Sequence, residues 1–68
     1  MNEEVFNLEV RKFLKKVGVQ SQREIEQAVR YNIEEGNLSG TEILSASVVL
    51  RVPNIGVEVS IDGEIGLA

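Results

Sequence analysis

The sequence of 68 residues contains no cysteine, no histidine and no tryptophan. Without cysteine no disulfide can form, which excludes the class of secreted domains held together by disulfides. The same absences remove thiolate nucleophiles, the usual zinc ligands and the one side chain whose charge normally changes near neutral pH. The remaining nucleophile candidates are serine and threonine hydroxyls with no histidine to activate them. We therefore expect no cofactor and no metal site, and we predict that the protein is not an enzyme.

Long apolar runs are missing as well. The longest is Val48-Val49-Leu50, far short of the roughly 20 residues that a membrane span needs. Glu3 and Glu4 stand where a signal peptide has positive charge. We expect a cytoplasmic protein that has no membrane partner.

Charge is unevenly distributed along the chain, whose net charge is -4. Residues 1–9 carry three acids and no base, residues 10–30 carry six bases and two acids, and residues 31–68 carry six acids and one base. A chain this short buries only about 60% of the surface that its unfolded form exposes, so self-association is a reasonable source of added stability.

The first half of the chain has the apolar spacing of helices. Phe6, Val10, Phe13 and Val17 recur at intervals of four, three and four residues, which predicts an amphipathic helix over about 2–17. Gly18 is the residue type that commonly ends such a helix.

A second helix is predicted over about 22–35. Ser21 and Glu24 have the spacing of a capping box, and Gly36 or Asn37 would end the helix. The two helices would form a helical hairpin with a short connection.

The second half alternates between apolar and polar residues through a turn at 53–56. Pairing Leu50 with Val59 and Val48 with Ile61 separates an apolar face from a polar one. This register predicts strands over about 43–52 and 57–67. We expect one α+β domain over residues 1–68, with two-layer ααββ architecture in which the helical hairpin packs on one face of a two-stranded antiparallel β-hairpin.

Leu8 breaks the helical pattern, because it falls opposite the apolar stripe and among cations. A single exposed leucine is ordinary, but an apolar centre with a basic rim is also how many partner contacts are built. The predicted partner surface consists of Val5, Leu8, Arg11, Lys12 and Lys15.

Nucleic-acid binding is the alternative. Residues 13–29 loosely resemble a helix-turn-helix with Gly18 in the turn, although Glu24 stands where an apolar residue is expected and a third helix is missing. Cations near the end of a helix also stabilise its dipole, which is the simpler explanation. The phosphate contacts in this alternative would be Lys16, Arg23, Gln27 and Arg30.

A helical hairpin would also bring Glu34 and Glu35 near Glu3 and Glu4. Such a carboxylate cluster has the chemistry to bind a hard cation. Nothing in the sequence has the alternating oxygen ligands and glycine of a calcium loop, so we expect these acids to be solvated.

Three stretches carry a resemblance to known sequences: residues 1–7 (MNEEVFN), 11–19 (RKFLKKVGV) and 21–29 (SQREIEQAV). The chain resembles a family of small bacterial proteins of unknown function and about this length. The resemblance implies a free-standing bacterial protein and carries no activity, cofactor or site residue.

These observations favour a non-enzymatic protein-interaction or regulatory module with an unknown protein partner. We also expect a weak homodimer formed through a strand edge or the outer face of the sheet, because a two-stranded sheet leaves two edges with unpaired backbone groups.

Overall fold

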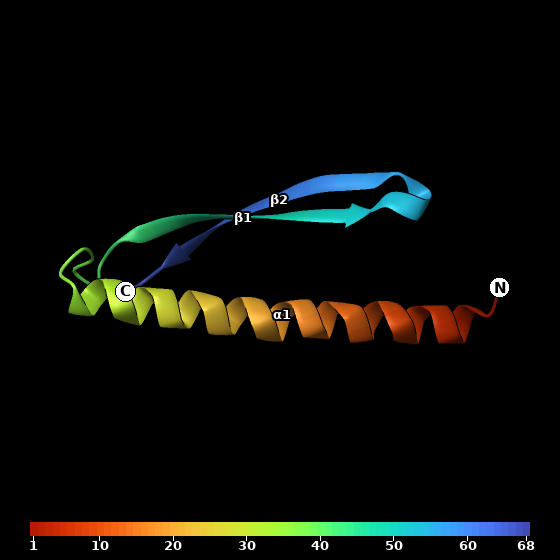
Figure 1. The fold of residues 1–68 in the computed structure, drawn as a ribbon, viewed down its shortest axis with the longest axis horizontal. Helices are drawn as coiled ribbons and strands as arrows, with labels where there is room; N and C mark the ends of the chain where they lie inside the picture. Colours follow the sequence, from red (N-terminus) through yellow and green to blue (C-terminus); the bar gives the residue numbers. More distant parts are fainter. The chain divides into compact units, whose positions relative to one another are not determined.

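The computed structural model describes all 68 residues and contains one long helix followed by a β-hairpin (Figure 1). Helix α1 spans Glu3–Glu34, strand β1 spans Ile43–Val52, the short 3-10 turn η1 spans Pro53–Ile55 and strand β2 spans Val57–Gly66. The chain divides into two compact units, Met1–Asn37 and Leu38–Ala68.

Both ends of α1 are capped by local sequence. The side-chain oxygen of Asn2 accepts a hydrogen bond from the N–H of Val5 at 3.1 Å, which satisfies one of the free donors of the first turn. At the other end Gly36 adopts a φ of 78°. The N–H of Gly36 donates to the carbonyl of Ile33, and the N–H of Asn37 donates to that of Asn32. These two bonds form a Schellman motif, so the predicted stop at Gly36 is confirmed.

The predicted helical hairpin is wrong, because α1 runs without a break through Gly18 and Ser21. Gly18 is not among the glycines with positive φ. A glycine inside a helix costs only about 0.5–1 kcal/mol relative to alanine, whereas a break would leave up to four N–H and four C=O groups without partners on its two sides. The continuous helix therefore has the lower free energy, and Ser21 is an interior residue and not a cap.

The apolar stripe also keeps its phase across the expected break. Phe6, Val17 and Ala28 follow one another at intervals of eleven residues, which is about three helical turns. Leu14 and Ile25 have the same separation. Because the stripe stays in phase, one continuous helix keeps these apolar residues on one face without a turn at Gly18. The architecture is thus helix, strand, strand.

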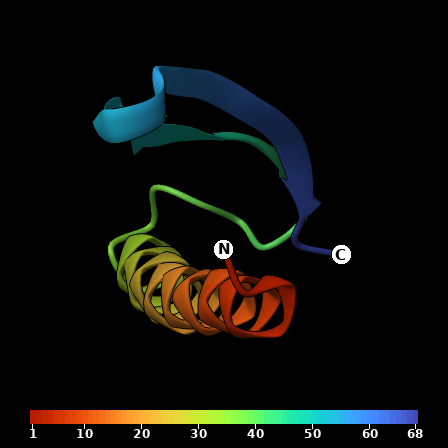
Figure 2. The ribbon, with the colours of Figure 1, turned by 90° about the vertical axis from the view of Figure 1, so that its right-hand side faces the viewer.

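The predicted hairpin register is confirmed. Leu50 pairs with Val59, Val48 with Ile61 and Val52 with Val57 in an unbroken antiparallel ladder. The chain reverses direction through η1, where Gly56 takes a φ of 69° and its N–H donates to the carbonyl of Pro53. Figure 2 shows the two strands twisting together as they leave this turn. One face of the hairpin is apolar and the other carries the polar residues.

No residue of the chain is fully buried. The exposed large apolar side chains are 38–62% accessible in α1 and 45–57% accessible on the apolar face of the hairpin, and the others are half-buried.

Candidate functional site

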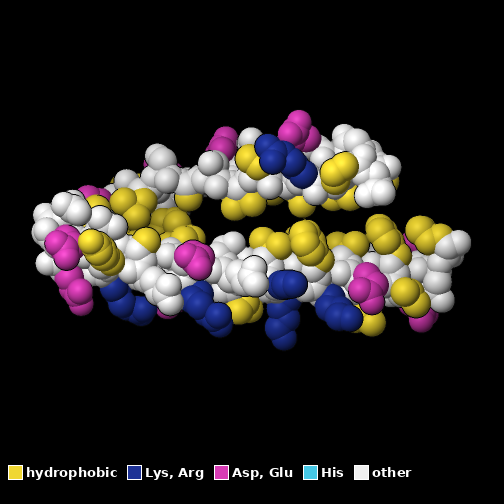
Figure 3. All heavy atoms as spheres, viewed as in Figure 1, with side chains coloured by type: hydrophobic (Ala, Val, Ile, Leu, Met, Phe, Trp, Pro, Cys, Tyr) yellow, Lys and Arg dark blue, Asp and Glu magenta, His cyan; other side chains and the backbone are white.

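All six cations of α1 lie on one side of the helix. At about 100° per residue they fall within an arc of about 140°, opposite the stripe that contains Phe6 and Val17. Figure 3 shows Lys and Arg side chains along one side of α1 and hydrophobic side chains along the other. We call this surface the basic face of α1; its residues are Val5, Leu8, Arg11, Lys12, Lys15, Lys16, Val19, Arg23 and Arg30.

Two aliphatic residues lie near the middle of the basic face. Leu8 is 62% exposed and Val19 is 49% exposed. They are about three turns apart on the same line of the helix, with cations on both sides of that line. The surface therefore combines two apolar side chains with cations around them.

Some of the charges on this face are already neutralised within the helix. Lys12 lies 3.8 Å from Glu9, and Arg30 lies 3.5 Å from Glu26. These exposed pairs contribute little to stability. The other four cations of the face form no ion pair within the chain: Arg11, Lys15, Lys16 and Arg23. Their charges remain free to interact with an anionic partner.

The structure brings together two surfaces that the sequence treated separately. The predicted partner surface around Leu8 and the alternative nucleic-acid contacts Lys16, Arg23 and Arg30 share the basic face, and Gln27 lies at its border. The resemblance to a helix-turn-helix is wrong, since no turn separates Phe13 from Val29. A recognition helix set at an angle to a first helix does not exist here.

The expected cluster of four glutamates does not form. Glu3 and Glu34 are the first and last residues of α1, and a straight helix of 32 residues is about 48 Å long. Nowhere in the chain do three or more acidic side chains lie in an arrangement that could hold a metal ion.

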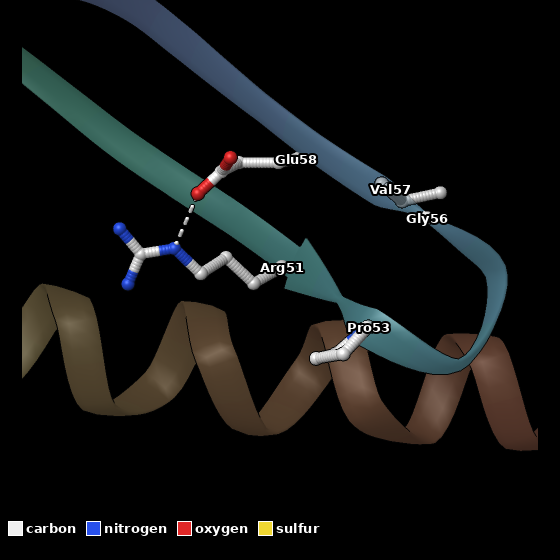
Figure 4. A pocket seen from close by; sticks show the side chains of 5 residues that line it. All are labelled: Arg51, Pro53, Gly56, Val57 and Glu58. Carbon is white, nitrogen blue, oxygen red and sulfur yellow. Dashed lines mark hydrogen bonds and ion pairs between the residues drawn. The ribbon is translucent and has the colours of Figure 1, made fainter.

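A shallow pocket of about 260 Å³ lies at the turn end of the hairpin and is lined by Arg51, Pro53, Gly56, Val57 and Glu58 (Figure 4). The Arg51 Nε donates to Glu58 Oε1 at 2.9 Å across the two strands. The two charges cancel locally, and the volume is below the 300–1,000 Å³ typical of small-molecule sites. The ion pair therefore acts as a cross-strand contact that agrees with the register.

The segment before β1 folds around the carboxylate of Glu42. Oε2 accepts from the N–H of Ser39 at 2.8 Å, and Oε1 accepts from the N–H groups of Gly40 at 3.0 Å and Thr41 at 3.1 Å. The N–H of Ser39 above all, followed by the N–H groups of Glu42 itself and of Gly40, lowers the pKa of Glu42 from 4.5 to about 2. Successive backbone N–H groups commonly form such a nest around an anion, and here the chain supplies the anion itself.

This geometry predicts how the segment responds to acid. The carboxylate is bound more tightly in the folded segment than in an unfolded one, so its contribution to stability is present above about pH 4.5 and is lost as the pH falls towards 2. Carbon-detected NMR titration should give Glu42 a midpoint near 2, and the amide signals of Ser39 and Gly40 should move with it. A midpoint near 4.5 would contradict the bonding described, and Glu42→Gln should remove the pH dependence of the amide signals.

Comparison with known proteins adds one positive finding. A family model described as "Family of unknown function (DUF6494)" matches residues 1–68. The chain belongs to this family. No curated protein and no solved structure matches it. The resemblance to an uncharacterised family is thereby confirmed, and the match brings no activity or site residue. No helix of the structure has the length and apolar character needed to cross a membrane.

Sequence reasoning missed Val19 and Glu42. Val19 falls outside the first predicted helix, but it lies eleven residues after Leu8 on the basic face of the continuous α1. The eleven-residue interval was readable in the sequence and would have found it. The role of Glu42 depends on a backbone conformation in which Gly40 has a φ of 102°, and no spacing rule indicated that conformation.

Proposed function

We propose that this chain is a non-enzymatic protein-interaction module that binds an acidic partner through the basic face of α1. The observation that carries the proposal is the continuity of α1, which places Leu8 and Val19 on one line with six cations around them. Partner contacts are commonly built with apolar anchors at the centre and charged residues at the rim. The four unpaired cations supply long-range attraction to acidic surfaces.

The chemistry of the residues supports a binding role over catalysis. The serine and threonine hydroxyls have no histidine in the sequence to act as their base. The carboxylate with the strongest perturbation, Glu42, has a lowered pKa and is held by backbone donors. A general acid at neutral pH needs the opposite shift.

Nucleic-acid binding is the second candidate, and the continuous basic face favours it. Arg11, Lys15, Lys16 and Arg23 are unpaired and could each contact a phosphate. Two features of the same face favour a protein partner instead. Leu8 and Val19 have no polar side-chain group that could bond to a phosphate. Glu26 lies among the cations, where its carboxylate accepts a hydrogen bond from Gln22 at 2.7 Å and pairs with Arg30.

Leu8→Ser tests the proposal, with Leu14→Ser as its matched control. Leu14 is a leucine of similar exposure, 52% against 62%, but it lies on the opposite side of α1. Leu8→Ser should change the free energy of unfolding by no more than about 0.5 kcal/mol and should abolish recovery of an acidic partner from a lysate of the source cells. Leu14→Ser should retain that partner.

Salt dependence separates the two candidates. Binding to duplex DNA through four phosphate contacts should weaken with a slope of about -3.6 in the logarithm of the association constant against log salt. A protein contact with apolar anchors should be much less sensitive to salt. A ligand that nuclease removes, with a steep salt slope and no effect of Leu8→Ser, would show the nucleic-acid candidate to be correct. A loss of stability of roughly 2 kcal/mol in Leu8→Ser would make Leu8 a structural residue and contradict its role as the anchor of a protein contact.

A further inference from the structure

The β-hairpin unit has two free edges. The sheet consists of β1 and β2 alone, and no residue of Leu38–Ala68 is fully buried. A two-stranded hairpin is marginally stable in water, and three or more strands or a covering element are normally required. Each edge also presents a row of unpaired N–H and C=O groups to which another strand can bond.

The hydrogen-bond pattern shows which backbone groups are free on β1. The N–H of Leu67 donates to the carbonyl of Glu42 at 2.9 Å, which makes these two opposed residues a hydrogen-bonded pair. Hydrogen-bonded and non-hydrogen-bonded pairs alternate along an antiparallel ladder, and the register of the ladder is unbroken. Even-numbered residues of β1 therefore bond to β2. The residues that point their N–H and C=O groups to the free edge are Ile43, Ser45, Ser47, Val49 and Arg51.

The two edges differ in charge. From Ile43 to Leu50, β1 carries no charged side chain, and neither proline nor lysine interrupts it. The outer face of β2 carries Glu58, Asp62 and Glu64. Proteins commonly protect free edges with charge, proline or bulges. The three acids of β2 are spread along that strand, whereas the one charged residue of β1, Arg51, lies at its end next to the turn. Two β2 edges would set acids of like charge together, whereas two β1 edges would not.

We propose that two copies of this chain pair through their β1 edges, antiparallel and related by a twofold axis at Ser47. The result is a four-stranded sheet in the order β2, β1, β1 of the second copy, β2 of the second copy. The five outward-pointing residues are spaced symmetrically about Ser47, so this register pairs all of their backbone groups. A twofold contact of this type is closed and produces a dimer, not a fibre.

Side-chain pairing across the new contact agrees with this register. On the apolar face Leu44 pairs with Leu50 of the second copy, and Ala46 pairs with its Val48. On the outer face Ser47 meets Ser47, and Ser45 meets Val49. The apolar faces of the two hairpins therefore continue into one another, as directly opposed residues of antiparallel strands share a face. The interaction uses only Leu38–Ala68 and is separate from the basic face of α1.

Single cysteines test the dimer cleanly because the chain has none of its own. In Ser47→Cys the two Cα atoms of a hydrogen-bonded pair would lie about 5.5 Å apart, within the range that a disulfide spans. Ser60→Cys is the matched control, since Ser60 is also a serine on the outer face but belongs to β2. Its counterpart would be three strand spacings away across the sheet, a separation of at least about 14 Å. Mild oxidation should therefore produce covalent dimer from Ser47→Cys and none from Ser60→Cys.

Sedimentation of the full chain provides the second measurement. The wild-type protein should shift from 7.5 kDa towards twice that mass as its concentration rises. Ser47→Lys places two like charges opposite each other and should restore the monomer mass, and Ser60→Lys should leave the dimer intact. A monomer mass for the wild type at millimolar concentration, or equal crosslinking of both cysteine variants, would overturn the proposal.

Discussion

Replacing Gly18 with proline is expected to lower the free energy of unfolding by about 3 kcal/mol or more. Gly18 lies in the middle of α1, where proline removes one backbone hydrogen bond and its ring collides with the carbonyl of the preceding turn. The basic face would lose its continuity at the same point, because a kink turns the cations of the second half away from those of the first. Circular dichroism during urea unfolding measures both the helix content and the stability.

Gly18→Ala is the control for that experiment. The sign of its effect on the free energy of unfolding distinguishes a continuous helix from a helical hairpin. A Cβ built on Gly18 meets no atom within 4 Å, so alanine should raise the free energy of unfolding by about 0.5–1 kcal/mol. In a helical hairpin that used Gly18 with positive φ, the same substitution would lower it. A destabilised Gly18→Ala protein would therefore contradict the continuous helix.

The second large effect is expected at Val48, where lysine should destabilise the hairpin by about 1–2 kcal/mol. Val48 faces Ile61 and has Ala46 and Leu50 as neighbours on the apolar face. Lysine loses the cross-strand contact and has a lower strand propensity than valine, and each of these effects is worth up to about 1 kcal/mol. Because a two-stranded hairpin is marginal, amide exchange of residues 43–66 should accelerate sharply.

Val49→Lys is the matched control. Val48 and Val49 are adjacent valines with similar exposure, 45% and 49%, but they lie on opposite faces of the hairpin. Val49 faces Ser60 and has Asp62 and Glu58 nearby across the strands, so a lysine there gains favourable charge and should change stability by less than about 0.5 kcal/mol. Equal effects of the two lysines would mean that the apolar face has no structural role.

The hairpin was predictable because its pairing is local. Val52 and Val57 are joined through a short turn, and every further pair follows from them by counting outwards. A register shifted by one residue would mix apolar and polar residues on both faces, so the alternation alone selected one solution. The end of α1 was predictable for a similar reason, since Gly36 supplies a positive φ that few other residues adopt without strain.

The middle of the helix was not predictable in the same way. Gly18 and the Ser21 to Glu24 spacing each favoured a break by roughly 1 kcal/mol. A break would also give up backbone hydrogen bonds, and this loss opposes the local preferences. The total free energy of these hydrogen bonds depends on the whole length of α1. A sequence motif of four or five residues does not indicate that total, so it could not predict the continuous helix.

The candidate site also consists of a part that the sequence predicted and a part that only the structure revealed. The sequence alone placed Leu8, Arg11, Lys12 and Lys15 on one side of a helix, because residues three and four apart share a face. It did not place Arg23 and Arg30 beside them, since a turn at Gly18 would have pointed the second half elsewhere. Helical and strand periodicity thus determined the local faces and the hairpin register. The tertiary structure decided that the basic face is continuous and that the carboxylate of Glu42 is held by its own loop, because both depend on backbone hydrogen bonds that no residue pattern specifies.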